Sequence, residues 1–209
     1  TPAATPEEFI PCYISYDEIC TVVEEAKAMN IRTAAHCIGG IGLDYCVKAG
    51  VDVIEHVYSI KPEQVKLLEE EFEGWIDMTS GIVLDPEREP YCPPAAVRKM
   101  RAAREYSRQC MNQIYRSKKI RYTIGTDANH GLLYKELEYA CEGGASALDA
   151  LKGVTVHAAR MCGMEDRTGQ IAEGMKADLI AVDENPLDKI ATLKDVRFVM
   201  KGGRIYKNI

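Results

Sequence analysis

The chain of 209 residues is long enough for one large domain, or for a domain with an appendage. Hydrophobic residues make up 46% and charged residues 28%, the balance of an ordinary globular protein with a sizeable core. The net charge of -6, without any cluster of lysine and arginine, argues against nucleic acid as a partner. No apolar run approaches the roughly 20 residues of a membrane-spanning helix, so we expect no membrane association.

The first three quarters of the sequence alternate between strand and helix patterns. Helices are predicted over residues 15–30, 41–49, 62–72, 95–117, 134–142 and 146–162, and strands over 31–36, 51–56, 75–79 and 120–127. Ser15 and Glu18 have the spacing of a capping box, which marks the start of the first helix. Residues 80–94 contain four prolines and are predicted to form a long loop. Strands that alternate with helices of this length indicate βα units on a parallel sheet.

The pattern changes after about residue 165. Short strand-like runs follow over 178–182, 196–200 and 204–206. Gly202 and Gly203 separate the last two runs, and a Gly-Gly pair is typical of a hairpin turn because both residues accept positive φ. We therefore predict a small antiparallel appendage, with a division of the chain into residues 1–164 and 165–209.

The eight cysteines are numerous, but no two of them form a Cys-x-x-Cys pair. Several stand among apolar residues of predicted helices, as Cys46 does beside Val47. We interpret them as small core residues of a cytoplasmic protein, because a reducing compartment keeps thiols free. The alternatives, a disulfide scaffold and a zinc–cysteine site, fit this length and spacing poorly.

Three of the four predicted parallel strands end in a residue that binds metal ions: His36, His56 and Asp127. Functional groups of parallel α/β folds gather at the carboxyl ends of the strands. Imidazole nitrogen and carboxylate oxygen are common ligands of zinc and similar cations. Either histidine alone would more often be structural. Since the chain has only 4 histidines, two of them at successive strand ends favour a metal site.

Asp127 has a second possible role, that of a catalytic base. A carboxylate beside a metal-activated water can accept its proton and later return it to the leaving group. The alternative is that Asp127 only caps the loop over residues 126–131. His130, in the same loop, either contacts the substrate or orients Asp127, or it is simply solvated, and the sequence does not favour one of these.

Two further residues are interpreted as structural. His157 lies inside the helix predicted over residues 146–162 and is expected to be a packing residue. Glu55 precedes His56, and because side chains alternate along a strand, it should point away from the side that carries His56.

These motifs, in this order, resemble the second half of an amidohydrolase of the imidazolonepropionase and Xaa-Pro dipeptidase-like group. The resembling segments are TAAH at 33–36, AGVDVIEH at 49–56, IGTDA at 124–128, TVHAARMCG at 155–163, GQIAEGMKADLI at 169–180 and VMKGGR at 199–204. Each motif alone is moderately specific. Their shared order and spacing, over nearly the whole chain from about residue 12, make the resemblance strong.

The resemblance implies an α/β fold, a (β/α)8 TIM barrel of which residues 1–164 supply about strands five to eight. Residues 165–209 would complete a β-sandwich begun by the N-terminus. In this family, the residues at the positions of His36 and His56 end strands five and six and bind metal. The residue at the position of Asp127 ends strand eight, binds metal and shuttles the proton.

The activity that the resemblance implies is hydrolysis of a C–N bond by metal-activated water. The implied substrate is a small amide, a cyclic amide or a dipeptide. The implied cofactor is one or two divalent ions, zinc by family default, although two histidines and a carboxylate equally suit manganese or iron.

The sequence departs from the family in what it lacks. It has no His-x-His pair for a first strand and no metal-bridging lysine on a fourth. Such barrels need roughly 250 residues, and only about 165 precede the tail strands. We therefore expect a piece of a longer protein, or a chain that pairs with its missing N-terminal half or forms a homo-oligomer with a second copy, because a half-barrel leaves open strand edges.

Two other interpretations compete with the enzyme. In the first, the chain is an assembly or binding module that kept the fold without a complete metal site. The missing ligands favour this alternative for the isolated chain, which we expect to be inactive. The retained His36, His56 and Asp127 favour an enzyme as the parent protein. A complete, smaller α/β protein with a flavodoxin-like sheet is the third interpretation, and it does not explain the antiparallel tail.

Overall fold

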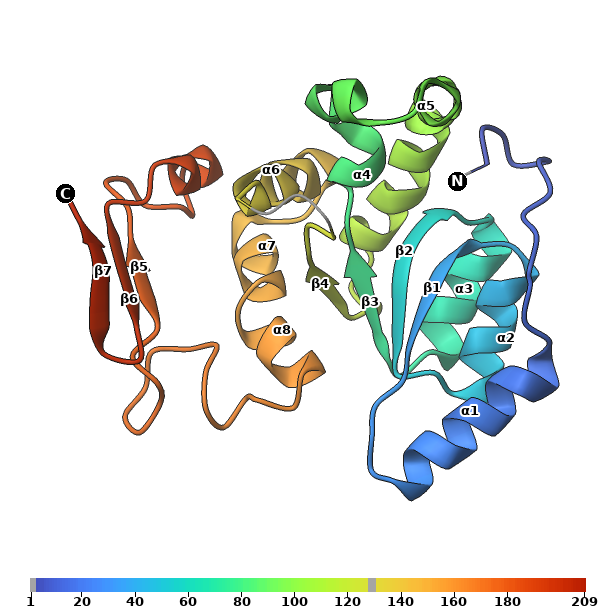
Figure 1. Ribbon diagram of the computed structural model, residues 1–209, viewed down its shortest axis with the longest axis horizontal. Helices are drawn as coiled ribbons and strands as arrows, with labels where there is room; N and C mark the ends of the chain where they lie inside the picture. Colours follow the sequence, from blue (N-terminus) through green and yellow to red (C-terminus); the bar gives the residue numbers. More distant parts are fainter. Residues whose placement is uncertain (1–2, 128–130) are drawn as a thin grey trace.

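Four parallel strands form the central sheet of the molecule, whose computed structural model describes residues 3–127 and 131–209. The strands are β1 (Ala34–Gly39), β2 (Val53–Ser59), β3 (Trp75–Met78) and β4 (Tyr122–Ile124), hydrogen-bonded in that order. At least one helix lies between each strand and the next (Figure 1). The α/β class and the parallel sheet predicted from the alternating pattern are therefore confirmed.

The helices agree with most of the predicted ranges. They are α1 (Tyr16–Ala28), α2 (Ile41–Ala49), α3 (Pro62–Glu71), α4 (Gly81–Leu84), α5 (Pro94–Arg116), α6 (Leu133–Gly143), α7 (Ala147–Gly153) and α8 (Val156–Met161), with 3-10 helices η1 (Pro86–Tyr91) and η2 (Ile190–Lys194). The predicted capping box is present, because the backbone N–H of Glu18 donates to Ser15 Oγ and the Glu18 carboxylate accepts from the Ser15 N–H. Within the described residues, no helix is both long and apolar enough to span a membrane.

Two segments differ from the predicted pattern. The proline-rich residues 80–94 hold α4 and η1 instead of a plain loop, and Pro86 opens η1, where the missing N–H of proline costs no hydrogen bond. The helix predicted over 146–162 is divided into α7 and α8. The break lies at Thr155, whose hydroxyl donates to the Leu151 carbonyl and whose backbone, at φ -124° and ψ -96°, is not helical.

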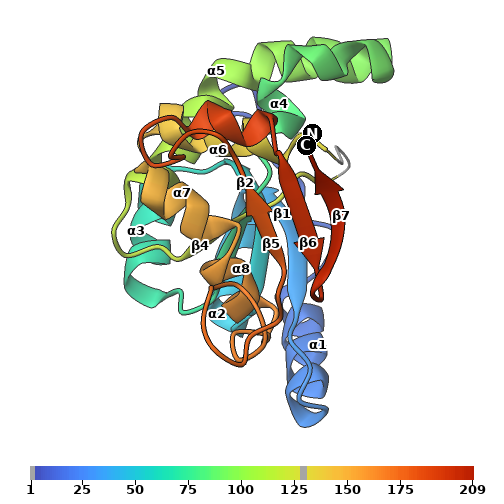
Figure 2. The ribbon, with the colours of Figure 1, turned by 90° about the vertical axis from the view of Figure 1, so that its left-hand side faces the viewer.

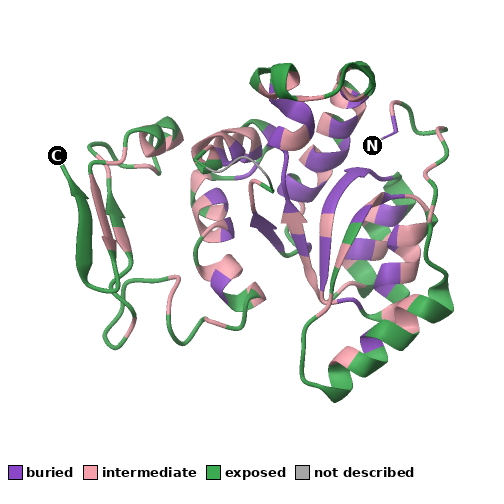
Figure 3. Ribbon diagram, viewed as in Figure 1, coloured by how far each residue is buried: buried purple, intermediate pink, exposed green. Residues whose placement is uncertain are grey.

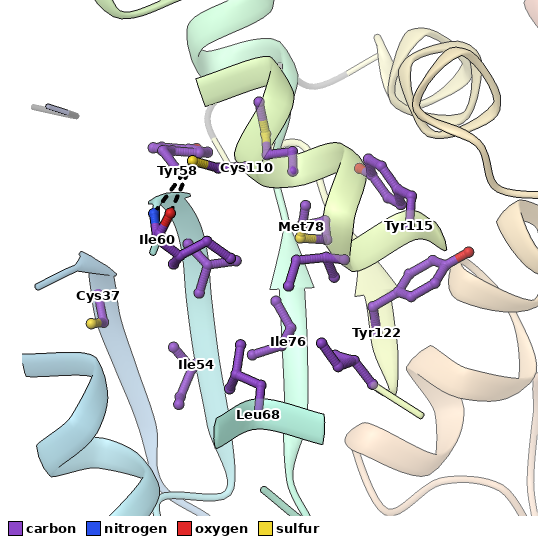
Figure 4. Packing of buried hydrophobic residues seen from close by; sticks show 14 of the residues in the cluster. Cys37, Ile54, Tyr58, Ile60, Leu68, Ile76, Met78, Cys110, Tyr115 and Tyr122 are labelled. Carbon is purple, nitrogen blue, oxygen red and sulfur yellow. Dashed lines mark hydrogen bonds between the residues drawn. The ribbon is translucent and has the colours of Figure 1, made fainter. Parts of the chain in front are cut away.

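One face of the central sheet carries the hydrophobic core. Ile54, Ile76 and Tyr122 share one register row across β2, β3 and β4. They belong to a single buried cluster with Leu68 of α3 and Ile114 of α5, part of which is drawn in Figure 4. Removing one such side chain typically costs about 2–5 kcal/mol. Figure 3 shows that burial concentrates in this sheet and in the helices beside it.

The cysteines are only partly a feature of the core. Cys37, Cys46 and Cys110 are buried, Cys162 is exposed and the other four are half-buried, all with free thiols. Cys110 Sγ lies 3.4 Å from the backbone nitrogen of Ile60 and donates to its carbonyl oxygen, also at 3.4 Å. The interpretation as core residues is therefore confirmed for three of the eight and wrong for Cys162.

The tail forms a separate sheet at the far side of the molecule from β1 (Figure 1), and this sheet faces the viewer in Figure 2. Strands β5 (Leu179–Ala181), β6 (Phe198–Lys201) and β7 (Arg204–Asn208) are antiparallel in that order. Gly202 and Gly203 take φ of 56° and 79° at the predicted hairpin. Every residue of β7 is exposed, and η2 contacts α6. The predicted antiparallel appendage is confirmed.

Candidate metal centre

The predicted ligands lie near the carboxyl ends of the strands but do not terminate them. β1 and β2 each continue for three residues beyond the histidine, and Asp127 lies three residues beyond the end of β4. The predicted strand ends at His36, His56 and Asp127 are therefore wrong. Both strands continue past the histidines because pairing continues there, with Cys37 opposite His56 and Gly39 opposite Ser59.

A β-bulge beside His56 changes the direction of its side chain. Cys37 pairs with His56 and Gly39 with Ser59, so β2 has one residue more than β1 between the two pairs. His56 takes φ 83° and the following Val57 takes φ 48°, in the left-handed region that β-branched residues rarely adopt. Bulges and such strained backbone occur preferentially at functional sites, where they re-aim a side chain.

The consequence of the bulge is that two imidazoles from adjacent strands meet. The ring centroids of His36 and His56 are 4.5 Å apart and the rings are inclined by 68°, edge to face. His36 is exposed, whereas His56 is buried. The structure therefore brings the two predicted histidine ligands together.

The environment of His56 keeps its ring neutral. Burial, followed by the nearby His36, lowers the pKa of His56 to about 4, and the negative charge of Asp127 opposes this shift. A neutral imidazole is the form that binds metal. His56 is therefore ready to act as a ligand at neutral pH without first losing a proton.

Two neighbours that were not predicted contact the Nδ1 atom of the His56 ring. Thr79 Oγ1 lies 2.7 Å and Tyr58 Oη 3.2 Å from Nδ1 of His56. The Tyr58 hydroxyl also contacts Thr79 Oγ1 and donates to the Thr79 carbonyl oxygen at 2.9 Å. The only sequence signal was their place at the ends of β2 and β3, since nothing in the composition marks them.

Asp127 is exposed and takes φ 54°. The charge of its carboxylate acts against the lowering of the pKa of His56. The same charge adds to the raised pKa of Asp77, whose main cause is burial. His130, the remaining candidate, lies outside the described residues. Within residues 3–127 and 131–209, no three His, Cys, Asp or Glu side chains are arranged to hold an ion. The structure thus joins His36 to His56 but does not complete a three-ligand site with Asp127.

The open face of the sheet carries a polar row. His36 is in register with Glu55, Glu55 with Asp77, and Asp77 with Thr123. The Thr123 hydroxyl donates to Asp77 Oδ1 at 2.7 Å. The expectation that Glu55 points away from the site is wrong, because residues paired in register share one face and the bulge at His56 interrupts the simple alternation.

His157 is confirmed as a packing residue. Its ring lies 5.5 Å from the ring of Trp75, and its Nδ1 is 3.2 Å from the carbonyl oxygen of Tyr122. It belongs to α8 and holds that helix against β3 and β4 rather than joining the two site histidines.

The chain belongs to the amidohydrolase family, because the model of that family matches residues 5–206. The resemblance seen in the sequence is therefore confirmed. The chain is similar to the ochratoxinase of Aspergillus niger, with 32% identity over 201 residues, 92% of this chain and 42% of that protein.

Solved structures show the same relationship. The crystal structure of a Xaa-Pro dipeptidase with bound methionine superposes with a TM-score of 0.84 at 29% identity, over 99% of this chain and 52% of the other. A prolidase complexed with N-methylphosphonate-L-proline gives a TM-score of 0.81 at 28% identity, over 94% and 50% of the two chains. The chain thus spans about half the length of these relatives.

Proposed function

We propose that this chain is the C-terminal part of a divalent-metal-dependent hydrolase that cleaves a C–N bond in a small amide, a cyclic amide or a dipeptide. The observation that carries the proposal is the 4.5 Å between the ring centroids of His36 and His56, near the carboxyl ends of neighbouring strands in an amidohydrolase-family chain. Since relatives include a Xaa-Pro dipeptidase, a prolidase and an ochratoxinase, Xaa-Pro dipeptides and amides of amino acids are the first substrates to test.

The residue types of the three candidate ligands fit a divalent ion. The imidazoles of His36 and His56 and the carboxylate of Asp127 would hold it, and zinc, manganese or iron all accept such ligands. When bound, the metal lowers the pKa of water and polarises the carbonyl of the substrate. Asp127 accepts the proton from the attacking water at its carboxylate oxygen and returns it to the leaving nitrogen. His130 is proposed to contact the substrate or to orient Asp127.

We further propose that residues 1–164 form about half of a (β/α)8 barrel and that residues 165–209 complete a β-sandwich. Support comes from β1 and β4, which are the edges of the sheet, and from the full exposure of β7. A cavity of about 660 Å³ lies beside β1, lined by apolar residues such as Ile10, Val22 and Ile38. Open edges and uncovered apolar surface of this kind call for a covering partner.

The covering partner is proposed to be the N-terminal half of the same protein, with a homo-oligomer of this chain as the other arrangement. The length of the relatives, about twice that of this chain, favours the first. That half would supply further metal ligands. We propose a cytoplasmic location on the interpretation of the cysteines as reduced thiols.

The second candidate function is an assembly or binding module without turnover. It is favoured for the isolated chain by the lack, within the part that the structure describes, of any arrangement of three ligands. In this case His36 and His56 would be retained only as a packed pair.

Elemental analysis of the purified 209-residue chain tests the metal site. We expect about one equivalent of metal in the native chain and none in a His36→Ala/His56→Ala double variant, with a His157→Ala variant as the matched control that keeps its metal. The protein completed with its N-terminal half is then assayed against Xaa-Pro dipeptides and N-acyl amino acids. A completed protein that binds no metal and hydrolyses none of them would show that the module interpretation is correct.

A further inference from the structure

The contacts around Nδ1 of His56 form a closed group of hydrogen bonds. Tyr58 and Thr79 are both buried, at 2% and 3% exposure, and His56 is exposed by only 6%. Four contacts connect the three residues: Thr79 Oγ1 with His56 Nδ1, Tyr58 Oη with His56 Nδ1, Tyr58 Oη with Thr79 Oγ1, and Tyr58 Oη with the Thr79 carbonyl oxygen. Because the group is buried, its own protons must satisfy these contacts.

The carbonyl oxygen of Thr79 sets the direction of the protons. A carbonyl only accepts, so the single hydroxyl proton of Tyr58 goes to it, at 2.9 Å. The short contact between the two hydroxyl oxygens then needs the proton of Thr79, which is donated to Tyr58 Oη. Thr79 has no second proton to donate to His56, so the 2.7 Å contact with Nδ1 requires the proton to reside on Nδ1.

The opposite tautomer satisfies fewer contacts. With Nδ1 unprotonated, the group holds two protons for four contacts and at least two contacts have no proton, whereas with Nδ1 protonated only one contact is left without its own proton. An unsatisfied buried polar contact of this kind costs about 1–3 kcal/mol. The proton on Nδ1 is therefore the arrangement that the geometry supports.

We propose that Tyr58 and Thr79 are positioning residues that hold His56 as the Nδ1–H tautomer and leave Nε2 free as the metal ligand. This inference rests on the proposed function only for the role of Nε2. The tautomer itself is a property of the described residues. Partners that fix the tautomer and orientation of a ligand histidine commonly change metal affinity by about 10–100-fold when they are removed.

Two variants of the same network should behave differently. In Tyr58→Phe, the Thr79 proton loses its acceptor, and the nearest remaining one is Nδ1 of His56 at 2.7 Å. The imidazole proton should then move to Nε2. In Thr79→Val, Tyr58 still donates to the backbone carbonyl of residue 79 and its oxygen, 3.2 Å from Nδ1, accepts the imidazole proton, so the tautomer should stay unchanged.

Long-range ¹H–¹⁵N correlation spectra of the ¹⁵N-labelled chain at pH 7.5 test the proposal, with His56→Gln used to assign the His56 signals. We expect a protonated Nδ1 and an unprotonated Nε2 in the native chain and in Thr79→Val, and the reverse in Tyr58→Phe. His157 is the internal control, because its Nδ1 faces the Tyr122 carbonyl and should keep its proton in all samples.

An unprotonated Nδ1 of His56 in the native chain would overturn the proposal, and so would a Tyr58→Phe spectrum without a change of tautomer. If Tyr58→Phe does not fold, the native and Thr79→Val spectra still decide the question. Neither result depends on metal binding. A failure here therefore leaves the proposed hydrolase intact, whereas the expected tautomer in a completed protein that neither binds metal nor hydrolyses the substrates would count against the proposed hydrolase alone.

Discussion

The imidazole rings of His36 and His56 meet edge to face with 4.5 Å between their centroids, although the strand register pairs His56 with Cys37. The bulge on β2 and the positive φ at His56 produce this approach. For the pairing of the two strands to continue past the bulge, the backbone of β1 must come very close to that of β2. Gly39 provides that close approach.

Gly39→Ala should therefore be strongly destabilising. A Cβ at this position would lie 1.7 Å from the carbonyl oxygen of Ser59, and the residue takes φ 137°. We expect a loss of about 3 kcal/mol or more in the free energy of unfolding, since both a backbone clash and an unfavourable φ contribute. Urea denaturation of the native chain and the variant measures this loss in the free energy of unfolding.

Gly174→Ala is the matched control for this prediction. Gly174 also has positive φ, at 83°, but nothing lies within 4 Å of an added Cβ. We expect a cost of only about 1 kcal/mol there, from the backbone conformation alone. Equal losses in the two variants would show that the approach of β1 to β2 adapts easily and does not depend on glycine.

Protonation of His56 should make the fold less stable in acid. Its pKa is lowered to about 4 in the folded chain by burial and by His36, against about 6.5 when unfolded. The contribution of neutral His56 to the free energy of unfolding is therefore full above pH 6.5 and is lost as the pH falls toward 4. The difference between the two pKa values corresponds to about 3 kcal/mol.

Comparison of the native chain with His56→Gln, in urea at pH 7.5 and pH 4.5, measures this effect. The native chain should lose more stability between the two pH values than the variant does, because glutamine does not titrate. His157→Gln gives the comparison for a second histidine outside the site, whose pKa burial also lowers and whose replacement should likewise reduce the loss of stability in acid. A native chain and a His56→Gln variant with parallel pH profiles would contradict a depressed pKa at His56.

Deprotonation of Glu136 should make the fold less stable as the pH rises, a pH dependence opposite to that of His56. This buried glutamate accepts hydrogen bonds from the N–H of Gly81 at 2.9 and 3.1 Å, and burial raises its pKa to about 8. A pKa raised above the unfolded value means that stability is full below about pH 4.5 and is lost as the pH rises toward 8. Glu136→Gln keeps the acceptor oxygen and removes the charge.

We therefore expect Glu136→Gln to be more stable than the native chain by about 5 kcal/mol at pH 8.5 and nearly equal to it at pH 4.5. Glu142→Gln, exposed on the same helix, should change stability little at either pH. Guanidinium titrations at the two pH values give the comparison. A Glu136→Gln variant that is less stable at pH 8.5 would mean that the charged form is the one the fold stabilises.

The alternating fold was predictable from sequence because each element carries its own local signal. The capping box at Ser15 and Glu18 and the hairpin at Gly202 and Gly203 depend on residues close together in the chain, and both are present. The division at Thr155 was missed because it depends on a single side-chain hydrogen bond that the apolar periodicity does not reveal.

The site was predictable only in its residue types. Two histidines after β-prone runs indicated a metal site, but the alternation rule placed Glu55 on the wrong face. That rule fails at a bulge, and a bulge depends on how two strands pair, which no single strand encodes. Tyr58 and Thr79 were missed for a related reason, because their contact with His56 joins β2 to the end of β3 across residues that are far apart in the sequence.

Asp127→Asn should abolish turnover in the protein completed with its N-terminal half, while the fold survives. Asn and Asp both tolerate positive φ, so the backbone at φ 54° is retained, and the residue is exposed. Loss of a general base typically costs about 10²–10⁴-fold in rate.

Asp127→Ala is the matched comparison, because alanine should lose the same activity and additionally destabilise the fold by about 1 kcal/mol at this φ. Turnover is measured on metal-loaded protein, with metal content determined in the same samples. A metal-loaded Asp127→Asn protein with native rates would show that Asp127 is not the residue that moves the proton, and Asp77, the other carboxylate near this end of the sheet, would be the next to replace.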